Sequence, residues 1–80
     1  MNSISNPANT QVSFDFQVNQ PETVHIRLSD YLGHEVNHTA QYLSGQHTFS
    51  FADISALTPG VLVYTVQIGS VTYSGSLIKS

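Results

Sequence analysis

The sequence has no cysteine, and only 9% of its 80 residues are charged. Without cysteine, a disulfide framework and a thiolate metal site are both excluded. Arg27 and Lys79 are the only basic side chains, so the chain lacks the cationic surface that phosphate contacts require, and we expect no nucleic-acid partner. No apolar run approaches the roughly 20 residues that a membrane-spanning helix needs.

The chain has the size of one domain, and no internal repeat, low-complexity segment or second domain is visible. The residues after Met1 lack the basic region and the apolar stretch of a signal peptide. We therefore expect residues 1–80 to be a single domain excised from a larger precursor. Any N-terminal signal peptide would lie upstream of these residues in that precursor.

Short segments in which apolar and polar residues alternate fill most of the chain, as in strands with one buried face. Turn residues recur about every ten residues, and no helical period is present. These features predict an all-β fold, a small antiparallel immunoglobulin-like β-sandwich of six strands, or seven if residues 3–5 pair at an edge. The first four strands are defined by Val12, Phe14 and Phe16, by Val24, Ile26 and Leu28, by residues 34–39, and by Phe49 and Phe51.

Several connections between these strands have recognisable turn chemistry. Asp30 and Gly33 fit the first and last positions of a type I turn followed by a glycine bulge. A second connection, to the fourth strand, is expected within residues 41–46, and residues 53–57 are expected to form a turn that buries Ile54 and Leu57. A type II turn is predicted at Thr58-Pro59-Gly60, where proline fixes φ and glycine accepts a positive φ.

The stretch 60–80 predicts a terminal hairpin whose pairing can be written from the sequence. Gly69-Ser70 suits a two-residue type II′ turn. Counting outward from this turn places the Tyr64 ring opposite Gly75, where it can cover the space left by the missing side chain. The other predicted pairs are Ile68 with Val71, Val66 with Tyr73, and Leu62 with Leu77. One face is then expected to be buried: Leu62, Tyr64, Val66, Ile68, Val71, Tyr73 and Leu77.

Side chains that could carry chemistry are scattered rather than grouped. His34, Glu35 and His38 come nearest to a metal motif, but two histidines at this spacing on a strand lie about 13 Å apart, too far for one ion. The four histidines are therefore interpreted as surface residues. No serine lies in a nucleophile-elbow pattern, and Asp30 and Asp53 are interpreted as turn residues. We expect no metal, no cofactor and no catalytic residue.

The order of the motifs is more informative than any single one. Taken together they resemble the type A C-terminal sorting domain of the type IX secretion system, and the resemblance covers nearly the whole chain. The matching motifs are Asn6-Pro7-Ala8, residues 24–36 around Asp30 and Gly33, Ser44-Gly45-Gln46-His47, residues 57–64, and Gly75-Ser76-Leu77-Ile78-Lys79.

The resemblance implies that the domain is a secretion signal rather than an enzyme. Such a domain is expected to follow a passenger protein, to be recognised as a folded domain by the outer-membrane translocon of Bacteroidota, and usually to be removed by a sortase-like signal peptidase. The passenger would pass through the periplasm and be secreted or held at the cell surface. An open sheet edge at the hairpin would let a partner, or a second copy in an edge-strand dimer, add a strand.

By position, the resemblance also assigns roles to particular residues. Asn6 and Pro7 would mark the start of the domain, with processing upstream of them, and Asp30, Gly33 and Val36 would form the turn motif. Export would depend on the terminal hairpin: Gly60, Val61, Leu62, Tyr64, Gly75, Leu77, Ile78 and Lys79. Tyr31 and Tyr42 leave an alternative open, an adhesive or carbohydrate-binding module of a secreted enzyme. A structural spacer domain is a third possibility.

Overall fold

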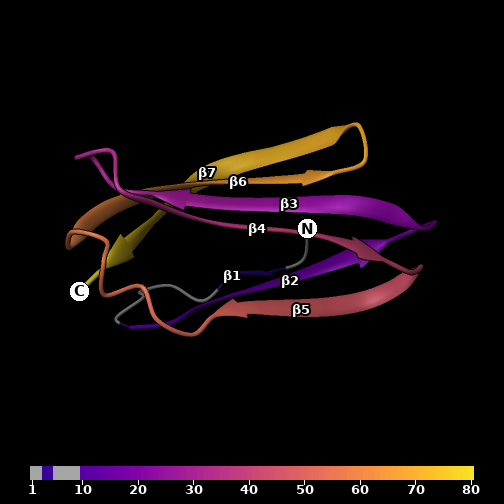
Figure 1. Cartoon of the computed structure of the whole chain (residues 1–80), viewed down its shortest axis with the longest axis horizontal. Coiled ribbons are helices and arrows are strands. Elements are labelled where there is room, and N and C mark those ends of the chain that lie inside the picture. Colours follow the sequence, from indigo (N-terminus) through magenta and orange to yellow (C-terminus); the bar gives the residue numbers. More distant parts are fainter. Residues whose placement is uncertain (1–2, 5–9) are drawn as a thin grey trace.

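The computed structural model of the chain describes residues 3–4 and 10–80, and all regular structure in these ranges is β-strand. The strands are β1 (Ser3–Ile4), β2 (Val12–Val18), β3 (Glu22–Ser29), β4 (Glu35–Tyr42), β5 (Gly45–Phe51), β6 (Gly60–Ile68) and β7 (Val71–Lys79). They form two layers, one sheet in the order β1-β2-β5 and the other in the order β4-β3-β6-β7 (Figure 1). The expected small antiparallel β-sandwich of six to seven strands is confirmed, whereas Asn6 and Pro7 lie outside the described residues.

The core lies between the two sheets, where the alternating apolar residues of both layers meet. Phe14 is fully buried at its centre, with its ring edge-on to Phe51 at 6.1 Å and to Tyr64 at 5.9 Å between ring centroids. Phe14 therefore joins the three-stranded sheet to the terminal hairpin. The buried apolar residues are Val12, Phe14, Phe16, Val18, Val24, Ile26, Leu28, Phe51, Ile54, Leu57, Leu62, Val66 and Leu77.

The connection between β5 and β6 closes one end of this core. The Ile54 amide donates to the Thr10 carbonyl at 2.9 Å, and the Leu57 amide donates to the Ile54 carbonyl at 3.0 Å. Both Ile54 and Leu57 are buried, so the predicted turn with two inward side chains is confirmed. Gly60 then has the expected positive φ, 124°, and pairs with Lys79 as the first residue of β6.

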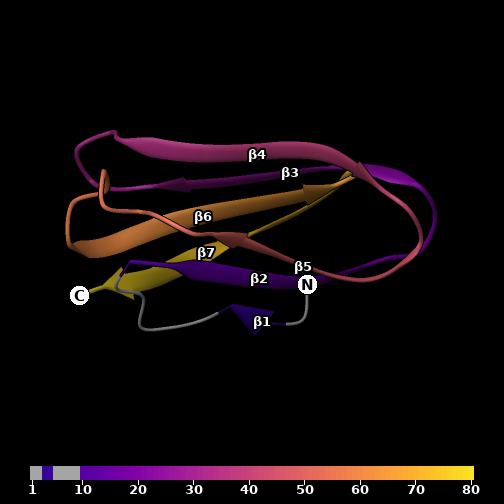
Figure 2. The same cartoon turned by 60° about the horizontal axis from the view of Figure 1, so that its bottom comes forward.

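The β4–β5 corner differs from the expectation. Strand β4 continues to Tyr42, beyond residue 39, so only residues 43 and 44 connect it to β5. The two strands lie in different sheets (Figure 2), and their inward side chains meet across the layers. His38 stacks on Phe49 with ring centroids 3.7 Å apart, and Tyr42 packs edge-on to Phe16 at 5.1 Å. These aromatic contacts hold the longer β4 in place.

Candidate recognition surface at the terminal hairpin

The terminal hairpin has the predicted pairing throughout. Ile68 is opposite Val71, and the ladder continues to Gly60 opposite Lys79. Gly69 has a φ of 59°, and no non-glycine residue in the described ranges has a positive φ. This combination is the one that a type II′ turn requires, because a type I′ turn would also need a positive φ at Ser70. The Gly69 amide also donates to the Thr23 carbonyl at 3.1 Å, which ties the turn to β3.

The Tyr64 ring occupies the space beside Gly75. A Cβ atom placed on Gly75 would lie 2.5 Å from the Tyr64 hydroxyl oxygen and 2.8 Å from its Cζ atom. Real side chains do not approach this closely, so glycine is required at position 75 as long as the ring remains in place. The predicted cross-strand pair is confirmed, and it fixes the register of β7 against β6.

The inner face of the hairpin is buried only over part of its length. Leu62, Val66 and Leu77 are buried, whereas Val71 and Tyr73 keep 51% and 40% of their surface exposed. The prediction that these last two residues are buried is therefore wrong. The remaining residues of that face, Tyr64 and Ile68, are half-buried.

The arrangement of the facing sheet explains this difference. Among the described residues, β1 pairs only with Asp15 and Phe14 of β2, so no described strand lies beside residues 16–18 of β2 on the β1 side. Gln17 of β2 lines a groove together with Val71 and Tyr73, and these two hairpin side chains stay partly open to solvent there. Lys79 shares the inner face with Leu77 and is buried at the other end of β7. The hairpin is thus buried at its base and about half exposed at its tip.

The outer face of the hairpin carries exposed apolar side chains near its base. Val61 is opposite Ile78 in the ladder, and Val63 follows on the same face. All three are about half exposed, at 53%, 47% and 52%. We call Val61, Val63 and Ile78 the terminal apolar patch. The patch spans β6 and β7, and β7 is one of the two edge strands of its sheet among the described residues.

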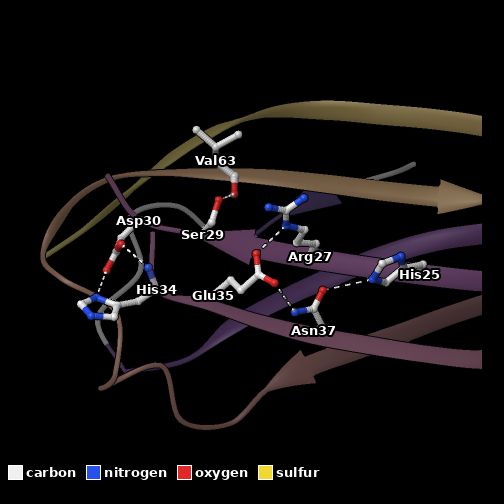
Figure 3. A network of polar contacts seen from close by, with 8 residues as sticks. All are labelled: His25, Arg27, Ser29, Asp30, His34, Glu35, Asn37 and Val63. Atoms are coloured by element: carbon white, nitrogen blue, oxygen red, sulfur yellow. Dashed lines mark hydrogen bonds and ion pairs between the residues drawn. The ribbon is translucent and has the colours of Figure 1, made fainter. Parts of the chain in front are cut away.

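The turn between β3 and β4 is built around the Asp30 carboxylate (Figure 3). Its Oδ1 accepts hydrogen bonds from the amides of Leu32 and His34, both at 2.9 Å, and Figure 3 shows the one from His34. Its Oδ2 accepts from His34 Nδ1 at 2.9 Å and from the Thr58 amide at 2.8 Å. The Gly33 amide donates to the Asp30 carbonyl at 3.3 Å, and Gly33 has a φ of 91°. The predicted turn with its glycine bulge is confirmed.

The contact with Thr58 gives this carboxylate a second role. The Asp30 side chain is fully inaccessible to solvent, and burial by itself would raise its pKa. The hydrogen bonds from Thr58, from the His34 side chain, and from the amides of His34 and Leu32 outweigh burial and hold the pKa well below its usual range. A buried carboxylate thus joins the β3–β4 turn to the segment that enters β6. Val36, the third residue of the motif, packs half-buried against the core.

Polar residues cover the outer face of β3 and β4, next to the patch (Figure 3). Arg27 Nε donates to Glu35 at 2.8 Å, and Asn37 donates to the same carboxylate at 3.1 Å. The hydrogen bond from Asn37, followed by that from Arg27, lowers the pKa of Glu35. His25 Nε2 contacts Asn37 Oδ1 at 3.1 Å. The outer face of the four-stranded sheet is therefore polar over β3–β4 and apolar at the base of β6–β7.

The aromatic cluster at the β4–β5 corner was not predicted. Besides stacking on Phe49, His38 hydrogen-bonds with the Tyr42 hydroxyl at 2.8 Å, and His47 Nε2 donates to the Leu43 carbonyl at 2.7 Å. Burial lowers the pKa of His38 and raises that of Tyr42. These side chains are therefore structural rather than simple surface residues. Period-two alternation placed His38 and Tyr42 on one face, and that was the only signal available in the sequence.

Neither tyrosine considered for sugar binding has a suitable partner. Tyr31 is exposed in the β3–β4 turn, and Tyr42 is half-buried at the far end of β4, so the two rings do not form one platform. Across residues 3–4 and 10–80, no three histidine, aspartate or glutamate side chains are grouped to hold a metal ion. The same residues include no helix with the length and apolarity needed to cross a bilayer.

Comparison with protein families gives a match over residues 5–80, to a family described as the secretion system C-terminal sorting domain. This match spans nearly the whole chain, from one residue ahead of Asn6 to one residue past the end of β7. Comparisons with curated proteins and with solved structures give no match.

Proposed function

The chain belongs to the family of secretion system C-terminal sorting domains, and we propose that it acts by presenting its folded terminal hairpin to the outer-membrane translocon. As a member of this family it is a C-terminal sorting signal for type IX secretion, and a sorting signal is not itself a catalyst. No observation supports the adhesive alternative. The finer proposal is that a passenger precedes the domain in a precursor of Bacteroidota and travels through the periplasm to the cell surface or the medium. A sortase-like peptidase then usually removes the domain.

The positions of the hairpin residues divide the proposed site into two groups. Leu62, Leu77 and Lys79 are buried and hold the hairpin on the core, together with the Tyr64 and Gly75 pair. Gly60 supplies the positive φ at the entry to β6. Val61 and Ile78 remain exposed, so they are the residues of the predicted set whose side chains can contact a partner directly.

The observation that carries the proposal is the terminal apolar patch beside an edge strand. An exposed apolar patch on a soluble domain marks an interaction surface more often than a single exposed residue does. An edge strand adds main-chain groups with which a partner can form a sheet. Because the chain has only seven charged residues, two basic and five acidic, long-range electrostatic steering contributes little. Recognition would then depend on shape and apolar contact.

The turn motif would act at a distance from the partner. Asp30 binds the Thr58 amide, and Thr58 lies two residues before Gly60. Loss of this contact would release the start of β6 and therefore the base of the patch. Asp30 and Gly33 are thus proposed as positioning residues for the hairpin, with Val36 packing the turn against the core.

The test is export of a periplasmic reporter fused ahead of residues 1–80, in a host with the type IX system and in a translocon-deficient strain. The double variant Val61→Ser and Ile78→Ser should lower surface delivery severalfold while the purified domain stays folded. The control is Leu43→Ser, which changes a residue that is 73% exposed but lies at the β4–β5 connection. Export of the patch variant at the wild-type level, or equal loss in the control, would contradict the proposed surface.

A further inference from the structure

The β4–β5 corner joins the two sheets through aromatic rings. The two strands lie in different sheets, and among the described residues β4 pairs only with β3 and β5 only with β2. The His38 ring of β4 lies parallel to the Phe49 ring of β5, with 7° between their planes and 3.7 Å between their centroids. The Tyr42 ring lies edge-on to Phe16 at 5.1 Å and to His47 at 4.8 Å. Side chains, two of them imidazoles, therefore hold β4 against β5 where no described ladder does.

The surroundings of His38 favour its neutral form. Its Nε2 atom hydrogen-bonds with the Tyr42 hydroxyl at 2.8 Å. A neutral imidazole can accept the hydroxyl proton through this nitrogen, whereas an imidazolium can only donate. The ring is half-buried, and burial lowers the pKa of His38 because the charged form loses more hydration than the neutral form. Stacking of a charged ring on Phe49 would return part of this loss, but burial has the larger effect.

The titratable groups that touch this cluster do not compensate a positive charge on His38. Tyr42 stays neutral because burial raises its pKa. His47, which packs against Tyr42 from β5, can only add positive charge. No ion pair among the described residues includes His38.

The carboxylates on the neighbouring strands are bonded to other side chains. The pairs are Glu22 with Gln20 at 2.9 Å, Asp15 with Thr48 at 2.6 Å, and Glu35 with Arg27 at 2.8 Å. Glu22 is opposite Tyr42 in the ladder, but its carboxylate is turned to the β6–β7 turn, where a Cβ atom on Gly69 would lie 2.5 Å from it. Alternation with the buried residues places the other charged or titratable side chains of these strands on the outer faces of the sheets: Asp15, His25, Arg27 and Glu35.

We propose that the β4–β5 corner is a proton-sensitive latch between the two sheets, which is closed while a neutral His38 stacks on Phe49 and opens when His38 is protonated and leaves the stack. The sorting function is not a premise of this inference. Only residues 43 and 44 connect β4 to β5, so the strands can part at this corner while the β3–β4 and β2–β5 ladders stay intact.

The direction of the pKa change sets the pH range of the latch. The neutral ring stabilises the closed corner fully above pH 6.5, the ordinary pKa of histidine. This contribution is lost as the pH falls from there through the lower pKa of the stacked ring. The folded pKa of Asp30 lies below 3.8, so the acid transition of the β3–β4 turn is expected at lower pH than the opening of the latch.

Proton nuclear magnetic resonance on residues 1–80 tests the latch. The nuclear Overhauser effects between the rings of His38 and Phe49 should weaken severalfold as the pH is lowered from about 7.5 to about 5, with the midpoint of the His38 titration itself. Those between the Tyr64 ring and Gly75 should not change. His38→Phe keeps a flat ring but cannot be protonated, so its contacts with Phe49 should persist at the lower pH. The matched control is His25→Gln, which removes an outer-face histidine bonded to Asn37 and should respond as the wild type does.

Contacts between His38 and Phe49 that keep their full strength after the His38 ring has titrated would overturn the proposal. Loss of the contacts between Tyr64 and Gly75 over the same pH range would also overturn it, because the whole domain would then be unfolding. A wild-type response in His38→Phe would assign the proton to another group, with the same consequence. If His38→Phe does not fold, the wild-type titration decides the question by itself.

Discussion

Gly75→Ala should destabilise the domain because the new methyl group meets the Tyr64 ring. The Cβ atom would lie 2.5 Å from the hydroxyl oxygen, 2.8 Å from Cζ and 2.9 Å from Cε2, so the ring must move. It cannot move freely, since Phe14 packs against it at 5.9 Å. Overpacking of this kind typically costs about 1–3 kcal/mol. For a domain of this size each kcal/mol lowers the thermal midpoint by about 4–8 °C, so the expected fall is at least about 4 °C.

The same substitution should have the opposite effect when the ring is shortened. In a Tyr64→Leu background the distal ring atoms are gone, while an apolar contact with Phe14 remains possible. Gly75→Ala then replaces a poor strand former with a residue that loses less backbone entropy, which is worth up to about 1 kcal/mol. The effect of Gly75→Ala should therefore change from destabilising to neutral or stabilising, a coupling of about 1–3 kcal/mol between the two positions.

Urea unfolding of the four proteins in this cycle measures the coupling. Because the chain has no tryptophan, far-ultraviolet circular dichroism and tyrosine fluorescence are the natural probes. Ser74→Ala, at an exposed position next to Gly75, is the matched control and should change the free energy of unfolding by about 0.5 kcal/mol or less. Equal effects of Gly75→Ala in both backgrounds would refute the reasoning, because the pairing of these two residues would then have no energetic consequence.

Three further changes test other parts of the fold. Leu62→Ala deletes a fully buried side chain and should lower the free energy of unfolding in urea by about 2–5 kcal/mol, whereas Val63→Thr on the exposed face should change it by about 0.5 kcal/mol or less. Gly69→Ala places a side chain at a φ of 59° and should lower the free energy of unfolding by about 1–2 kcal/mol. An equal loss of stability in Ser70→Ala would argue against the assignment of the turn. The folded pKa of Asp30 lies below its ordinary value of 3.8, so the carboxylate stabilises the domain fully above that value and the contribution is lost as the pH falls below it. Asp30→Asn should therefore lower the thermal midpoint at pH 7 and flatten its decline in acid, and an acid decline parallel to that of the wild type would contradict this role.

The sequence predicted those features that depend on neighbouring residues. Alternation and the Gly69-Ser70 corner were sufficient to write the β6–β7 ladder, because a two-residue turn leaves one register and a slip would expose the apolar face. Asp30 and Gly33 likewise define their turn within four residues. The burial of Ile54 and Leu57 followed from two apolar residues in a segment too short for a helix.

What the sequence could not predict depends on which segments face one another. Val71 and Tyr73 have the alternation of a buried face, but they line a groove instead of packing under a strand, and the length of an opposing strand is not encoded in the hairpin itself. The hydrogen bond between Asp30 and Thr58 joins residues 28 positions apart. Turn chemistry therefore predicted the role of Asp30 within its own turn, but not its contact with Thr58. The stacking of His38 on Phe49 depends in the same way on the packing of two sheets.

These placements also decide which experiment can identify the recognition surface. Removing residues 77–80 would delete Leu77 and Lys79, which are buried, and would leave Leu62 without its partner in the ladder. Loss of export after that truncation would follow from unfolding alone. The patch variants change only exposed side chains, so a folded Val61→Ser and Ile78→Ser domain that is not exported points to recognition of the patch. If that variant is exported and only Leu62→Ala fails, the translocon requires a stable fold but not this surface.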